Sequence, residues 1–95
     1  QVYTRHVNFG QPIQQAITAP RFLLGRTWGD TGTNLKMESR FDDGLVSGLK
    51  DAGHDVEVID AFPDLMGHAG AVSMRPDGVM EGGSDPRADG RAAGV

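Results

Sequence analysis

The sequence predicts an α+β fold in which an antiparallel sheet of about four strands carries helices on one face. Residues 35–38 and 55–60 alternate apolar and polar side chains, which is typical of half-buried strands. Residues 41–53 carry an apolar stripe at helical spacing. Residues 76–78 read Pro-Asp-Gly, a turn sequence between two further stretches that resemble strands.

Two short helices are expected at the start of the chain. Residues 2–9 place apolar side chains at helical spacing and stop at Gly10, a residue type that commonly follows a helix. Pro12 suits the first turn of a second helix, because an amide hydrogen would have no partner there. Pro20 ends this helix, since the residue before a proline disfavours helical geometry. Its predicted buried face consists of Ile13, Ala16 and Ile17.

The middle of the chain predicts a loop, a strand and a helix. Residues 25–33 are rich in Gly, Thr and Asp and contain the single tryptophan, Trp28, so we expect a loop. The strand over 35–38 follows. The next helix has Asp42 as its predicted N-cap and Gly53 as its left-handed C-cap. Its predicted buried stripe consists of Leu45, Val46 and Leu49.

The last part of the chain predicts a strand, a hairpin and a tail. The strand covers residues 55–60, where Val, Asp and Glu side chains alternate. Residues 69–74 and 79–81 pair around the Pro-Asp-Gly turn, because Pro presets one backbone angle and Gly accepts a positive φ. Residues 82–95 are rich in Gly and Ala and are predicted to form the tail.

Composition excludes several functions. A net charge of −4 without a basic run argues against nucleic-acid binding. The absence of Cys excludes disulfides and Cys-based zinc sites, and no apolar stretch is long enough for a membrane span. The 14 glycines and the apolar fraction of 38% predict weak stability for a free-standing domain. Because Gln1 opens within the first predicted helix, we expect residues 1–95 to be a single partial domain of a longer protein.

Short motifs with a fixed order run along the whole chain. They are Val7-Asn8-Phe9-Gly10, Ala19-Pro20-Arg21-Phe22, Leu35-Lys36-Met37-Glu38, His54-Asp55-Val56-Glu57-Val58, Pro76-Asp77-Gly78 and Asp85-Pro86-Arg87. Together they resemble the C-terminal end of the small subunit of gamma-glutamyltransferases (gamma-glutamyltranspeptidases), which are N-terminal-nucleophile hydrolases. Two features depart from the family: residues 23–33 form a longer connection, and Val95 stands where an aromatic residue often ends the chain.

The resemblance implies a fold, a reaction and partners. The fold would be the C-terminal portion of a four-layer αββα sandwich. The family moves a gamma-glutamyl group from glutathione-type donors to water or an amine through an acyl-enzyme. The implied partners are the large subunit, the remainder of the small subunit and a small gamma-glutamyl substrate. Strand edges left open would favour homo-oligomers of the fragment. Many members are periplasmic or extracellular, and a cytoplasmic location stays open.

The resemblance also implies where the chemistry lies. The family's nucleophilic Thr and its substrate-binding groups precede the region represented here, so we assign no catalytic residue and no cofactor, and expect the fragment alone to be inactive. Arg21, Arg87 and Asp85 are candidates for holding the active-site frame or assisting precursor maturation. The alternative is an ordinary salt bridge that pins the tail. No metal site is assigned, because metal-ligand spacing is lacking among His6, His54 and His68.

Two other functions stay open from the sequence. One is a non-catalytic interaction module that shares this ancestry. The other is an acylase acting on a different amide, such as a beta-lactam side chain, which the long connection around Trp28 allows. Trp28 itself could cover a substrate pocket or anchor its loop to the core, as lone tryptophans commonly do.

Overall fold

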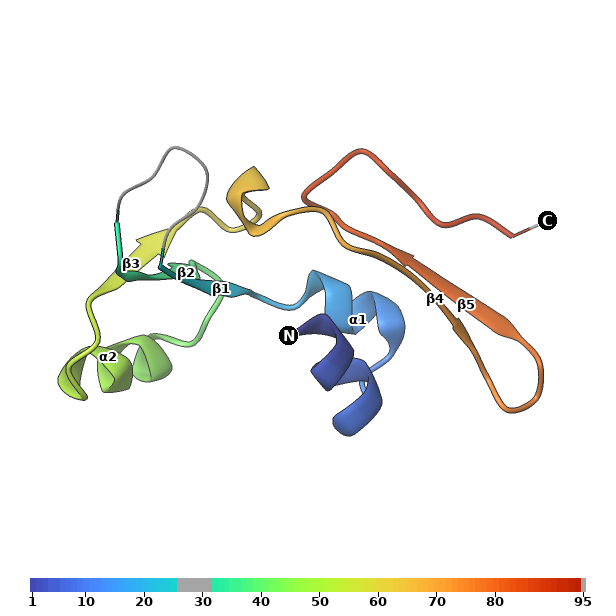
Figure 1. The fold of residues 1–95 in the computed structure, drawn as a ribbon, viewed down its shortest axis with the longest axis horizontal. Helices are drawn as coiled ribbons and strands as arrows, with labels where there is room; N and C mark the ends of the chain where they lie inside the picture. The colour runs from blue at the N-terminus through green and yellow to red at the C-terminus, as the bar shows by residue number, and fades with distance from the viewer. Residues whose placement is uncertain (26–31, 95) are drawn as a thin grey trace. The chain divides into compact units, whose positions relative to one another are not determined.

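A computed structural model of the protein describes residues 1–25 and 32–94. The chain divides into two compact units, which are described separately (Figure 1). The terminal unit joins residues 1–19 with residues 67–95, so segments from both ends of the chain build it. The central unit consists of residues 20–66.

The terminal unit begins with two short helices. The first, η1 (Thr4–Asn8), has π-helical hydrogen bonding, so the predicted first helix is present with a wider turn than expected. It is followed by Gly10 at a φ of 69°. The second helix, α1 (Ile13–Thr18), starts after Pro12 and stops where Ala19 takes an extended conformation ahead of a proline. Both of its predicted ends are confirmed.

An antiparallel hairpin completes the terminal unit. Its strands are β4 (Gly70–Met74) and β5 (Met80–Ser84), with Val72 opposite Gly82. At the turn, the amide of Arg75 donates to the carbonyl of Val79 at 2.8 Å, and Gly78 has a φ of 86°. These bonds confirm the predicted hairpin and its turn.

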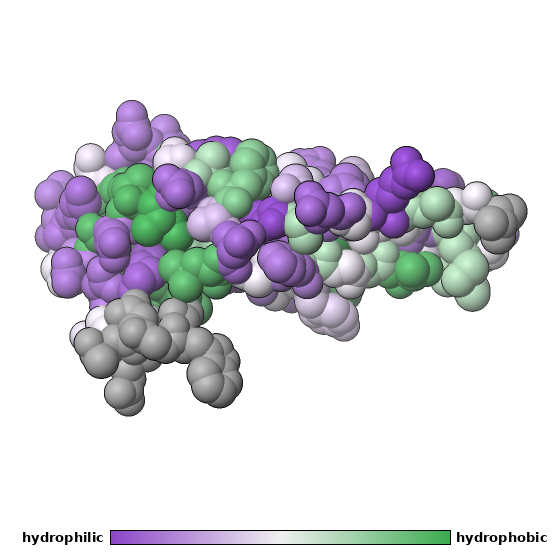
Figure 2. Space-filling view, turned by 90° about the horizontal axis from the view of Figure 1, so that it is seen from above, coloured by the Kyte–Doolittle hydropathy of each residue, from purple (hydrophilic) through white to green (hydrophobic). Residues whose placement is uncertain are grey.

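The two faces of the hairpin differ. One face packs on α1, whose predicted buried residues Ile13, Ala16 and Ile17 are all buried. The other face exposes three large apolar side chains. Green areas in Figure 2 mark apolar surface. The exposed apolar side chains on this face of the hairpin are Val72, Met74 and Met80. An exposed apolar face of this kind is a candidate contact surface for another part of the protein or a partner.

The central unit is built around a three-stranded sheet in the order β1-β2-β3. The strands are β1 (Phe22–Leu24), β2 (Leu35–Glu38) and β3 (Val56–Ile59). A single helix, α2 (Asp43–Asp51), connects β2 to β3, and a 3-10 turn, η2 (Asp64–Met66), follows. All four residues of the central strand β2 are buried.

The α+β class is confirmed, but the strand pairing corrects one prediction. The described residues form a three-stranded and a two-stranded sheet in place of the predicted single antiparallel sheet of about four strands. The strands β1 and β2 are antiparallel, whereas β2 and β3 are parallel. A parallel pair needs a crossover connection, and α2 supplies it between the two strands. The short strand β1 was also missed, because its three residues are too few to show an alternating pattern.

Both ends of α2 lie where the sequence predicts them, but the predicted burial of the helix is not found. At the C-terminus, Gly53 has a φ of 101° and its amide donates to the carbonyl of Lys50 at 3.0 Å. The amide of His54 donates to the carbonyl of Leu49, which completes a Schellman motif and confirms the predicted C-cap. At the N-terminus, Asp42 occupies the N-cap position, but its side chain makes no capping hydrogen bond. The predicted buried stripe of Leu45, Val46 and Leu49 is wrong, because no residue of α2 is buried and Leu45 is 47% exposed.

Two remaining expectations concern the loop and the membrane. Trp28, with its predicted role over a pocket or as an anchor, lies outside the residues that the structure describes. Among the helices of residues 1–25 and 32–94, none has the length and apolar character needed to span a bilayer.

Candidate functional site

A buried ion pair lies directly after β5 in the terminal unit. The Nη1 atom of Arg87 is 2.9 Å from Oδ1 of Asp85, and the exposed fractions of the two side chains are 0% and 1%. The backbone amide of Arg87 donates to the same oxygen at 3.0 Å. This tight turn is closed by a further bond from the amide of Ala88 to the carbonyl of Asp85. We call Asp85 and Arg87 the tail anchor.

Arg87 also caps the C-terminal end of α1. Its Nη1 atom donates to the carbonyl of Ile17 at 3.1 Å, and its Nη2 atom donates to the carbonyl of Ala19 at 3.2 Å. The last carbonyls of a helix have no partner within the helix and carry partial negative charge, so a guanidinium is a favourable partner. One side chain therefore binds a carboxylate and a helix end together.

Asp85 ties the tail to a third segment. Its Oδ2 atom accepts a hydrogen bond of 2.7 Å from the amide of Ala69, one residue before β4. The tail anchor therefore joins the end of α1, the entrance to β4 and the exit from β5. Breaking one partner of such a buried pair leaves an uncompensated charge, which typically costs about 3–5 kcal/mol.

Arg21 belongs to the central unit, whereas the tail anchor belongs to the terminal unit. Its backbone amide donates to Oε2 of Glu38 at 2.9 Å, and the amide of Glu38 donates back to the carbonyl of Arg21 at 3.1 Å. Its Nη1 atom donates to the carbonyl of Met66 at 3.2 Å. Arg21 thus joins Glu38, the last residue of β2, to Met66, the last residue of the central unit.

Glu38 and Arg40 extend this cluster, and neither was predicted as a site residue. Arg40 Nη2 lies 3.1 Å from Oε2 of Glu38, and the Glu38 side chain has no exposed surface. Arg40 Nε donates to the carbonyl of Ala61 at 3.0 Å, and its guanidinium carbon stacks 3.8 Å from the ring centre of Phe62. In the sequence, the feature that could have indicated this pair is Glu38 at the end of a predicted strand with Arg40 two residues later.

The three histidines have separate surroundings. His6 Nδ1 is 2.7 Å from the carbonyl of Gln11, and its Nε2 is 3.1 Å from Oγ of Ser73 on β4. His54 lies at the apolar pocket of the central unit. In the part of the chain that the structure describes, no three His, Cys, Asp or Glu side chains gather in a way that could hold a metal ion.

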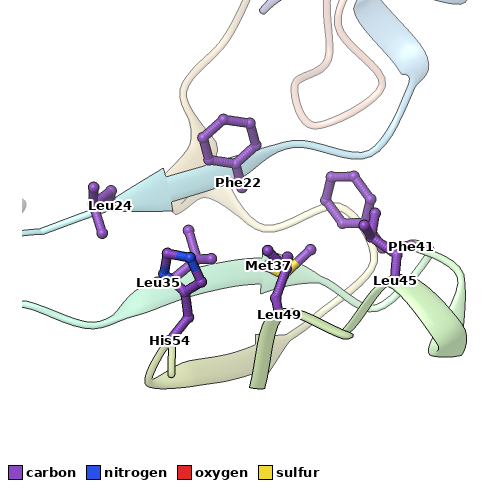
Figure 3. Close-up of a pocket in the computed structure, with 8 residues that line it drawn as sticks. All are labelled: Phe22, Leu24, Leu35, Met37, Phe41, Leu45, Leu49 and His54. Carbon is purple, nitrogen blue, oxygen red and sulfur yellow. The ribbon is translucent and has the colours of Figure 1, made fainter. Parts of the chain in front are cut away.

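An apolar pocket of about 350 Å³ opens between the sheet and α2 of the central unit (Figure 3). Among the described residues, its lining combines side chains of β1, β2 and α2 with Phe41 and His54. These described lining residues include no Asp, Glu, Lys or Arg that could bind the amino and carboxyl groups of an amino-acid substrate. The residues that line it are Phe22, Leu24, Leu35, Met37, Phe41, Leu45, Leu49 and His54.

Comparisons with known proteins agree on one family. The model of the family described as gamma-glutamyltranspeptidase matches residues 1–95. An oxamate amidohydrolase proenzyme from Klebsiella pneumoniae is 48% identical over 93 residues, covering 98% of this chain and 18% of that protein. A glutathione hydrolase-like proenzyme from Bacillus subtilis is 45% identical over 94 residues, covering 99% of this chain and 18% of that protein.

A solved structure shows the same similarity in three dimensions. The crystal structure of a cephalosporin acylase from Bacillus halodurans aligns with a TM-score of 0.83 at 29% identity, covering 98% of this chain and 16% of that one. The chain therefore spans less than about a fifth of the length of the relatives it matches.

Proposed function

Because the gamma-glutamyltranspeptidase family model matches residues 1–95, this chain belongs to that family, and we propose that it forms the C-terminal part of the enzyme's small subunit. The match over the whole chain is the observation that carries the proposal. The family consists of hydrolases and transferases of the N-terminal-nucleophile class. The remainder of the small subunit and a large subunit are the proposed partners, since the matched relatives are about five times as long.

The proposed reaction is transfer or hydrolysis of gamma-glutamyl groups from glutathione-type donors. An acyl-enzyme divides it into two steps: a nucleophile takes the acyl group, and then water or an amine releases it. The glutathione hydrolase-like name of the Bacillus subtilis relative, at 45% identity, supports this substrate class.

A second candidate is hydrolysis of a different amide by the same acyl-enzyme chemistry. The relative at 48% identity is an oxamate amidohydrolase, and a cephalosporin acylase shares the fold at 29% identity. These proteins favour an amide whose acyl group is not glutamyl. A non-catalytic interaction module is the remaining alternative, and lack of turnover on any amide by the intact protein would favour it.

Within the enzyme, we assign this chain a supporting role and no nucleophile. The buried guanidinium of Arg87 binds the carboxylate of Asp85 and the backbone carbonyls of Ile17 and Ala19, which is a structural set of partners. Both curated relatives are named proenzymes, so their precursors are cleaved to become active. We propose that the tail anchor, and Arg21 with Glu38, hold the frame in which this maturation takes place.

The test uses the intact proenzyme that contains this chain. Hydrolysis of a chromogenic gamma-glutamyl anilide is compared with release of ammonia from oxamate under the same conditions. Turnover of the anilide alone would support the gamma-glutamyl reaction, and turnover of oxamate alone would support the second candidate. If a fully cleaved protein turns over neither substrate, the gamma-glutamyl reaction is contradicted, and the result favours a different amide, such as a beta-lactam side chain, or the non-catalytic module.

The supporting role is tested with Arg87→Ala and a matched control, Arg75→Ala. Arg75 pairs with Asp77 at 3.2 Å, but its side chain is 52% exposed, so its loss should leave cleavage of the precursor unchanged. Arg87→Ala should block or strongly slow cleavage. Equal cleavage of the two variants would overturn the proposed role of the tail anchor.

A further inference from the structure

The side chain of Gln14, on α1, pairs with both backbone groups of one residue on β5. Its Nε2 atom donates to the carbonyl of Ser84 at 2.8 Å, and the amide of Ser84 donates to its Oε1 atom at 3.0 Å. The two residues are 70 positions apart in the sequence. A neighbouring strand would offer the same donor and acceptor to Ser84, so this carboxamide takes the place of a strand residue.

The orientation of this carboxamide is fixed by three hydrogen bonds. Besides the two bonds to Ser84, Nε2 donates to Oγ1 of Thr18 at 2.9 Å, one turn further along α1. The amide of Ser84 can only donate and its carbonyl can only accept, so exchanging the oxygen and nitrogen of Gln14 would break both bonds.

The position of Ser84 gives the pairing its consequence. Ser84 is the last residue of β5, and Asp85 of the tail anchor follows it directly. We propose that Gln14 is a positioning residue for precursor maturation: it fixes the end of β5 and so places Asp85 and Arg87 against α1. The inference rests on the proposed role of the tail anchor in maturation.

The first experiment follows cleavage of the intact proenzyme over time on denaturing gels. Loss of two hydrogen bonds in Gln14→Leu should slow cleavage by about tenfold or more. Gln15→Leu makes the same chemical change at the neighbouring position of α1, which is exposed as Gln14 is, and should cleave at the wild-type rate. Equal rates for these two variants would show that the carboxamide of Gln14 has no positioning role.

A second variant separates hydrogen bonding from simple packing. In Gln14→Glu, the ionised carboxylate can accept a hydrogen bond from the amide of Ser84 but cannot donate one to the carbonyl of Ser84. The protonated carboxyl group can make both bonds. The cleavage rate of Gln14→Glu relative to wild type should therefore rise several-fold between about pH 8 and about pH 5. A ratio that does not change with pH would overturn the two-bond account, even if Gln14→Leu fails to fold.

The Arg87→Ala variant separates this inference from the proposal beneath it. Normal cleavage of Arg87→Ala would overturn the role of the tail anchor, and the role of Gln14 with it. Blocked cleavage of Arg87→Ala together with wild-type cleavage of Gln14→Leu would overturn the inference about Gln14 alone. Slow cleavage of both, with Gln15→Leu unaffected, is the expected result.

Discussion

Gly83 on β5 lies so close to α1 that a Cβ atom built on it would be 2.8 Å from Cδ1 of Ile17. Real Cβ atoms do not approach other atoms so closely, so the buried end of the Ile17 side chain, or one of the two elements, would have to shift. The packing of α1 on β5 therefore favours glycine at position 83. This glycine lets α1 lie directly on the backbone of β5.

A methyl group at this position should destabilise the protein. Gly83→Ala forces Ile17 or the strand to shift, and overpacking of this kind typically costs about 1–3 kcal/mol. Chemical denaturation of the intact mature enzyme measures the change in unfolding free energy.

Gly48 provides the matched control for Gly83. It lies in α2, and a Cβ atom built on it would meet nothing within 4 Å. Gly48→Ala should therefore stabilise the helix by up to about 1 kcal/mol, because alanine has the higher helix propensity. A Gly83→Ala enzyme as stable as wild type would contradict the close packing between α1 and β5.

Replacing the carboxylate of the tail anchor should be costly. Asp85→Asn keeps the shape of the side chain but leaves the fully buried guanidinium of Arg87 without its counter-charge. The expected loss of stability is about 3–5 kcal/mol, accompanied by failure of precursor cleavage. Thermal unfolding and gel analysis of the same preparation measure the two effects. The control, Asp77→Asn, removes a carboxylate that is 51% exposed and should change neither readout.

The buried carboxylate of the central unit should behave similarly on a smaller scale. Glu38→Gln preserves an acceptor for the amide of Arg21 but removes the charge opposite Arg40, whose side chain is 25% exposed. Because solvent screens part of that pair, we expect a loss of about 1–3 kcal/mol in denaturant unfolding. Glu57→Gln, at an exposed residue of β3, is the comparison and should have little effect. An equal response of the two variants would count against a structural role for the Glu38 cluster.

The isolated chain should be inactive and should self-associate. It exposes Val72, Met74 and Met80 on one face of the hairpin, and the outer strands of its sheets have open edges. Gel filtration of the purified fragment should give species larger than its 10.1 kDa, and gamma-glutamyl anilide should not be turned over. A monomer that hydrolyses the anilide would overturn both the partial-domain view and the absence of a nucleophile.

Local signals predicted much of the fold. The Gly53 C-cap and the turn at Gly78 depend on a few neighbouring residues, so glycine at a positive φ was readable from the sequence. The parallel pairing of β2 with β3 depends on how α2 crosses between them, and the alternating patterns of the two strands carry no information about direction.

The candidate site was predictable only in part. The spacing of Asp85 and Arg87 indicated the ion pair that the structure contains. The other partners of Arg87, the carbonyls of Ile17 and Ala19, lie about 70 residues away in the sequence and are backbone groups that every residue carries. The role of Gln14 could not be predicted from the sequence either, because its partners are the backbone amide and carbonyl of Ser84.

The terminal unit is assembled from residues 1–19 and 67–95, so its contacts join segments that the ribosome makes at different times. The hydrogen bond from Arg87 to the carbonyl of Ile17 can form only after Arg87 has left the ribosomal exit tunnel. Such long-range closure is slow compared with local helix formation and comes after synthesis of the segment between. If cleavage of the precursor needs this closure, a translation product interrupted before Arg87 stays uncleaved.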